Sequence, residues 1–80
     1  MDTITAIRKS ILHLCQERKL PINKIATISA LSHTSLQSIL YGNSNNPKIL
    51  TLKMLCDGLD ITLAEFFDTP EFNTLEQEIK

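Results

Sequence analysis

Apolar residues recur along the chain at the spacing of amphipathic helices, and the strict alternation typical of strands is weak. The first predicted helix covers residues 3–18. Its apolar face follows the i, i+3, i+4 rule and consists of Ile4, Ile7, Ile11, Leu14 and Cys15. Because the residue before a proline avoids the helical region, the stretch Lys19-Leu20-Pro21 should end this helix.

Two shorter helices are predicted next, over residues 22–29 and 33–41. Pro21 suits the start of the first, since its missing N–H is not needed there. Ser32 suits the N-cap of the second, because its hydroxyl can accept a backbone N–H one turn in. Gly42 can adopt the left-handed conformation that ends a helix. The inward positions of this pair are Ile25, Ala26, Leu36, Ile39 and Leu40, with Ile28 as a further candidate.

A loop and a fourth helix follow this pair. Residues 43–47, Asn-Ser-Asn-Asn-Pro, have the composition of a loop. The fourth predicted helix covers 48–58 and stops at Gly58. Its inward positions are Leu52, Leu55 and Cys56, with Ile49 as a further candidate.

The C-terminal third predicts one short helix and one longer amphipathic helix. Thr62 and Glu65 form a capping box, so a short fifth helix should start there and end at residues 66–67. The last segment, 70–79, carries Phe72, Leu75 and Ile79 on one side. The chain is therefore expected to be all-α, a five-to-six-helix bundle. Residues 1–80 would form one domain, with a C-terminal helical extension over 68–80.

Charge is distributed unevenly along the chain although the net charge is only −1. Residues 1–56 hold seven basic and two acidic residues, a net charge of +5, whereas residues 57–80 hold one basic and seven acidic residues, a net charge of −6. Such a split favours an anionic partner for the first part of the chain. No apolar run approaches the roughly 18 residues of a membrane span, and the N-terminus does not resemble a signal peptide. We therefore expect a cytoplasmic protein.

The pattern of nucleophilic and metal-ligating residues argues against an enzyme. His13 and His33 do not complete a metal-ligand spacing with Cys15 or Cys56, and the sequence contains no Gly-rich phosphate loop. We expect both cysteines to be buried free thiols that pack as small hydrophobes. No metal or other cofactor is expected.

Residues 20–67 contain a set of short motifs in a fixed order. The motifs are Ile25-Ala26, Leu31-Ser32, Gly42, Asn46-Pro47, Leu52-x-x-Leu55-Cys56-x-x-Leu59 and Ile61-Thr62-Leu63-Ala64-Glu65-Phe66-Phe67. In this order and at this spacing they resemble the phage-repressor/Cro-type (XRE-like) helix-turn-helix family. The resemblance implies a lambda-repressor-like DNA-binding fold in which residues 22–41 are the helix-turn-helix.

The chain departs from the family pattern at two places. The family favours Gly in the turn between the two helices, where this chain has Ala30, so we expect a slightly different turn. Many members also carry a buried Arg–Glu pair, and the matching positions here are Cys15 and Leu40. Replacing both charges by apolar groups keeps a working core, because neither charge is left buried alone. We therefore expect Cys15 and Leu40 to be close in space.

The resemblance also implies which residues contact DNA. The family reads bases with the N-terminal part of its second helix in the major groove. The matching outward residues here are His33, Thr34, Gln37 and Ser38. The expected contacts to the DNA backbone come from Asn23, Lys24, Ser32, Ser35, Asn43, Ser44, Asn45, Asn46 and Lys48. Neutral donors are common in such contacts.

The resemblance implies a sequence-specific transcriptional regulator, a repressor that binds a palindromic double-stranded operator as a homodimer. Phe67, Phe72, Leu75 and Ile79 are the candidate dimer contacts. An alternative is that residues 70–79 fold back on the first helix, which would keep the acidic segment away from DNA. The helix over 33–41 could also present only a solvated face. The same fold could instead bind a protein partner, as an interaction module or an antitoxin-like regulator.

Overall fold

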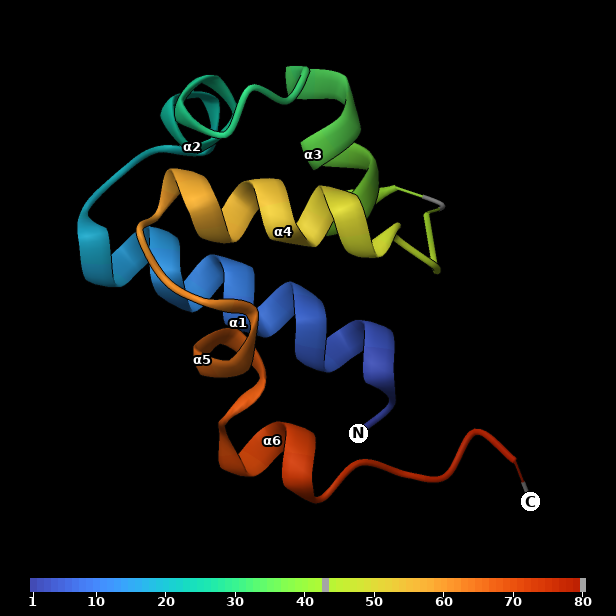
Figure 1. The fold of residues 1–80 in the computed structure, drawn as a ribbon. Helices are drawn as coiled ribbons and strands as arrows, with labels where there is room; N and C mark the ends of the chain where they lie inside the picture. The colour runs from blue at the N-terminus through green and yellow to red at the C-terminus, as the bar shows by residue number, and fades with distance from the viewer. Residues whose placement is uncertain (43, 80) are drawn as a thin grey trace.

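The computed structural model describes residues 1–42 and 44–79, whose regular structure is helical, as predicted. The helices are α1 (Thr3–Arg18), α2 (Ile22–Ile28), α3 (His33–Tyr41), α4 (Ile49–Gly58), α5 (Leu63–Phe67) and α6 (Pro70–Asn73). Figure 1 shows the α2–α3 pair above α4, with α1 below α4 and α6 at the bottom of the view; α5 contacts α4, and α6 contacts α1. Within the described residues, no helix is both long and apolar enough to span a membrane.

The predicted inward faces form one buried core. The buried residues shared by the prediction and the structure are Ile7, Ile11, Cys15, Ile25, Ala26, Leu36, Ile39, Leu40, Leu52, Leu55 and Cys56, and Phe66 is buried with them. Each fully buried aliphatic side chain contributes about 1.5–3 kcal/mol of transfer free energy. Cys15 and Leu40 belong to this same cluster, as their apolar character requires. Ile28 and Ile49 are exposed instead, at 39% and 58% of their surface, so these two candidates were wrong.

Three of the helix junctions use one turn geometry. Lys19, Ala30 and Asp60 each have a positive φ, of 55°, 57° and 59°. In each turn the next residue donates its amide to a carbonyl five positions back: Leu20 to Cys15 (3.0 Å), Leu31 to Ala26 (2.9 Å) and Ile61 to Cys56 (2.9 Å). These are the bonds of a Schellman motif. The expectation of a different turn at Ala30 was therefore wrong, because the surrounding helices hold alanine in the left-handed conformation.

Both glycines serve close packing rather than left-handed turns. Gly42 has a φ of −105°, so the predicted left-handed end of α3 was wrong. A Cβ at Gly42 would lie 3.0 Å from the Ser38 Cα atom. A Cβ at Gly58 would lie 2.5 Å from the Ser29 Oγ and 2.9 Å from the Ile28 carbonyl oxygen. Gly58 thus allows the end of α4 to pack directly on the end of α2.

The predicted helix over 70–79 is much shorter than expected. α6 ends at Asn73, and residues 74–79 are not helical. The Thr74 hydroxyl donates to the Pro70 carbonyl oxygen (2.9 Å), a local bond that competes with helix continuation. Glu76 and Glu78 would also have stood at the negative C-terminal end of the longer helix, where acids are unfavourable.

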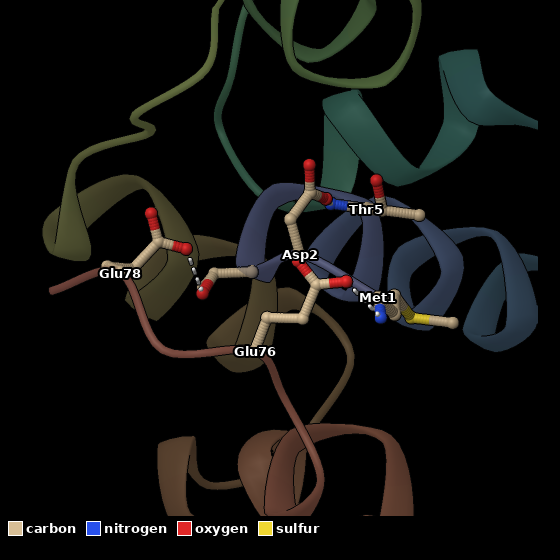
Figure 2. A network of polar contacts seen from close by, with 6 residues as sticks. Met1, Asp2, Thr5, Glu76 and Glu78 are labelled. Atoms are coloured by element: carbon tan, nitrogen blue, oxygen red, sulfur yellow. Dashed lines mark hydrogen bonds and ion pairs between the residues drawn. The ribbon is translucent and has the colours of Figure 1, made fainter. Parts of the chain in front are cut away.

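The C-terminal segment instead folds back on α1. The Glu76 amide donates to the Met1 carbonyl oxygen (3.2 Å), and the Glu76 carboxylate accepts from the Met1 amine (3.3 Å). The Thr3 hydroxyl donates to the Glu78 carboxylate (3.1 Å). Figure 2 shows both acids beside the start of α1, next to its N-cap Asp2. The C-terminal segment therefore contacts α1, as the fold-back alternative requires.

Candidate nucleic-acid interface

The start of α3 is capped by two serines without any acidic residue. The Ser32 hydroxyl accepts from the Ser35 amide (3.0 Å) and donates to the Ser35 hydroxyl (2.8 Å). No acid occupies the first turn of α3. Because each helix N-terminus carries a partial positive charge, this end of α3 is favourable for an anion and is not neutralised internally.

The outward face of α3 carries most of the predicted base-contacting residues. His33, Thr34 and Gln37 are exposed, whereas Ser38 is half-buried. The Ser38 carbonyl oxygen accepts from the amides of Gly42 (3.2 Å) and Ser44 (3.3 Å). The backbone of Ser38 therefore anchors the loop, and its side chain is less available than the other three.

The predicted backbone-contacting residues flank α3 on two sides. Asn23 and Lys24 are exposed in the first turn of α2. In the loop after α3, Ser44 is half-buried while Asn45, Asn46 and Lys48 are exposed; Asn43 lies outside the described residues. Ser32 and Ser35 are exposed and bonded to each other.

Arg8 of α1 joins this region, although no sequence pattern assigned it a role. Its Nε donates to the Ile39 carbonyl oxygen at 2.7 Å. One terminal nitrogen of its guanidinium lies 3.5 Å from the Gly42 carbonyl oxygen and 3.4 Å from the Asn45 Oδ1. Position 8 lies on the polar side of α1, and only the folded chain shows that this side meets the end of α3.

A shallow groove of about 710 Å³ runs between the start of α1 and the loop. Its lining includes Asp2, Arg8, Asn45, Asn46 and Glu78. The fold-back alternative was expected to keep the acidic segment away from the predicted DNA-contacting residues. Glu78 departs from that expectation, because its contact with Thr3 brings it into the same groove as the loop.

The exposed apolar residues lie mainly outside the predicted dimer contacts. Phe67 and Phe72 are half-buried and pack with Phe66 in an aromatic cluster, with ring centroids 4.8–5.9 Å apart. Leu75 is half-buried, and Ile79 is 87% exposed. The other apolar side chains with the highest exposed fractions are Leu50 (71%), Tyr41 (64%) and Ile49 (58%), at the end of α3 and the start of α4.

The two thiols are unsuited to reactive chemistry. Cys15 and Cys56 are free and buried, and burial raises the pKa of both thiols. A raised pKa keeps them in the unreactive thiol form at neutral pH. In the part of the chain that the structure describes, no cluster of three metal-ligating side chains occurs.

Comparison with known proteins identifies the same architecture. A profile of the Cro/C1-type HTH DNA-binding domain matches residues 10–71. A crystal structure of the prophage Lp1 protein 11 superposes with a TM-score of 0.80 and 29% sequence identity. That match covers 94% of this chain and 100% of the other. Among curated proteins, none matches this chain significantly.

Proposed function

Because the chain belongs to the Cro/C1-type helix-turn-helix DNA-binding domain family, whose members are DNA-binding regulators rather than enzymes, we propose that it is a transcriptional repressor. It binds a palindromic operator as a dimer and reads sequence with α3 in the major groove. The observation that carries this proposal is the uncharged, serine-capped start of α3 with His33, Thr34 and Gln37 exposed beside it.

The exposed side chains of α3 can recognise bases by hydrogen bonding. Gln37 can make two hydrogen bonds to the N6 and N7 edge of adenine, and the methyl group of Thr34 can contact thymine. α3 carries no arginine, so guanine is a less favoured target for this helix. The operator half-site is therefore expected to contain an A·T pair opposite Gln37.

The backbone contacts combine a few cations with several neutral donors. Lys24, which precedes α3 in the chain, and Lys48, which follows it, are exposed, and Asn45 and Asn46 lie on the loop. We expect each protomer to neutralise about two to four phosphates, which gives a shallow dependence of affinity on salt. Affinity should then depend strongly on dimerisation and on the fit of the bases.

Selection of bound duplexes from a random DNA pool tests the proposal. The wild-type protein should enrich a sequence with two inverted half-sites. Gln37→Ala should lose preference at one base pair of each half-site, at a cost of about 1–3 kcal/mol. Gln16→Ala, on the exposed side of α1, is the matched control and should select the wild-type sequence. Absence of any enriched sequence for the wild type would refute the function.

The dimer has two candidate contact regions. Ile79 remains the most exposed of the four C-terminal candidates, whereas Ile49 and Leu50 are exposed at the start of α4. We propose that the C-terminal candidates, with Ile79 foremost, make the dimer contact. Sedimentation of Ile79→Asp should then show a monomer, while Leu50→Asp should sediment as the wild type. The opposite result would move the contact to α4, and a monomeric wild type on operator DNA would refute the dimer.

A further inference from the structure

We propose that Arg8 is a positioning residue for DNA binding, which holds the end of α3 and the following loop in the geometry that contacts the phosphate backbone. The inference rests on the proposed function, since its consequence is read in DNA affinity. It also has a consequence in the free protein, because the contacts of Arg8 are present without DNA.

The first contact of Arg8 closes the C-terminal end of α3. The last carbonyls of a helix have no partner within the helix and carry a partial negative charge. The Nε of Arg8 donates to one of them, that of Ile39, at 2.7 Å, and this bond is partly buried. A charged donor at such a position forms a hydrogen bond stronger than a neutral one. Arg8 therefore fixes α3 relative to α1.

The second set of contacts extends from α3 into the loop. One terminal nitrogen of Arg8 lies within 3.5 Å of both the Gly42 carbonyl oxygen and the Asn45 Oδ1. With its carbonyl oxygen occupied in this way, the Asn45 side chain is oriented so that its amide group points away from the guanidinium. The NH₂ group of an oriented amide can donate a hydrogen bond to a phosphate oxygen.

The charges around Arg8 favour this positioning role over direct attraction of DNA. Asp2 and Glu78 line the same groove as Arg8. Both carboxylates offset the positive potential of Arg8 toward solvent. Its Nε and one terminal nitrogen are also directed to protein carbonyl oxygens. Arg8 thus contributes little to the electrostatic attraction of a phosphate. Its removal should change the conformation of the loop more than the attraction of DNA.

The test compares Arg8→Ala with Lys9→Ala, which removes an equal charge from the neighbouring exposed position. The probe is a duplex carrying the sequence that the wild type enriches, bound well below the unfolding temperature of each variant. Arg8→Ala should bind about 10- to 100-fold more weakly, the equivalent of one charge-assisted hydrogen bond. Lys9→Ala should bind within about threefold of the wild type, as expected for an exposed charge. Arg8→Lys, which can keep the bond to Ile39, should recover part of the loss.

Two readouts separate positioning from other roles. The slope of affinity against salt should stay that of the wild type in Arg8→Ala, whereas a loss of about one phosphate equivalent would show direct contact and overturn the proposal. Amide hydrogen exchange of the free variant should rise at Gly42 and Ser44, whose amides bond to Ser38. A uniform rise over all helices, with unchanged affinity of the folded protein, would show a purely structural role and overturn the proposal as well.

The outcomes also distinguish this inference from the proposed function. If the wild type prefers a sequence and Arg8→Ala binds it equally well, the inference alone fails. If the wild type prefers no sequence, the proposed function fails and the inference fails with it.

Discussion

The turn between α2 and α3 and the turn between α4 and α5 share one backbone geometry but differ in their caps. Ala30 and Asp60 take the same left-handed conformation, with φ of 57° and 59°. In both turns an aliphatic residue follows, and then a hydroxyl residue, Ser32 or Thr62, that caps the next helix. The two turns therefore position the following helices by the same hydrogen bonds.

The difference lies three residues after each cap. In α5 this residue is Glu65, whose carboxylate accepts from the Thr62 amide (2.9 Å) and completes a capping box. In α3 it is Ser35, which completes the cap without charge. A carboxylate stabilises a helix start but repels phosphate. The comparison indicates that the uncharged cap of α3 leaves that helix start compatible with a DNA phosphate. At the start of α5, the Glu65 carboxylate would repel a phosphate.

The two turns lie against each other at Gly58, and substitution of this glycine should have the largest effect on stability. Gly58→Ala would place a Cβ 2.5 Å from the Ser29 Oγ and 2.9 Å from the Ile28 carbonyl oxygen. We expect a loss of about 2 kcal/mol in the free energy of unfolding, measured by urea denaturation, because overpacking outweighs the higher helix propensity of alanine. Combining it with Ser29→Ala, which removes the nearest atom, should restore part of the loss. A stabilised Gly58→Ala would contradict the close approach.

Exchanging the third residues of the two caps tests the functional part of the comparison. Ser35→Glu should bind the selected operator about tenfold more weakly, a difference of about 1.4 kcal/mol, because the new carboxylate faces phosphate. Its melting temperature should not fall, since a capping box replaces the serine pair. The reciprocal variant Glu65→Ser should melt lower and bind the operator unchanged. Equal affinities for Ser35→Glu and the wild type would show that α3 does not approach DNA by its N-terminus.

Glycine substitution at the two left-handed residues sharpens the comparison further. Ala30→Gly should stabilise the protein by about 1 kcal/mol, because glycine adopts positive φ without the steric cost that alanine has. Asp60→Gly should stabilise it less, since aspartate tolerates this conformation better than alanine. Calorimetric melting temperatures should rise by about 4–8 °C for Ala30→Gly in a domain of this size. A lower melting temperature for Ala30→Gly would argue against the observed conformation.

The smallest expected effect concerns Asp2 of α1, the only acidic N-cap among the six helices of residues 1–42 and 44–79. Hydrogen bonds from Thr5 lower the pKa of Asp2 below its ordinary value of 3.8. Since the folded-state pKa is lowered, the stabilisation is fully present above about pH 4 and is lost as the pH falls through the folded-state pKa. Asp2→Asn should therefore show a flatter decline of stability below pH 4, in denaturation curves taken at several pH values. In the control variant Ser32→Asn, which keeps a neutral cap, the stability should decline below pH 4 as it does in the wild type.

The sequence by itself was sufficient to predict most of the helices, most of their inward positions and the caps at Ser32 and Thr62. These features depend on residues within one or two turns of each other, so periodicity and hydroxyl positions reveal them. The family resemblance over residues 20–67 rests on the same local motifs, and the profile match to residues 10–71 confirms it. Helix existence was also predicted reliably except in residues 74–79, where local propensity competes with bonds to Met1 and to Thr3 at the start of α1.

Other features depend on contacts between elements that are distant in sequence. The bond from Arg8 to Ile39 spans 31 positions, and the contact of Gly58 with Ser29 joins the ends of two helices. The periodicity of the sequence does not predict which carbonyl oxygen a charged side chain will contact. It also does not predict which backbone segment will pack against a glycine. Ala30 is left-handed for the same reason: packed helices on both sides determine a conformation that alanine alone disfavours.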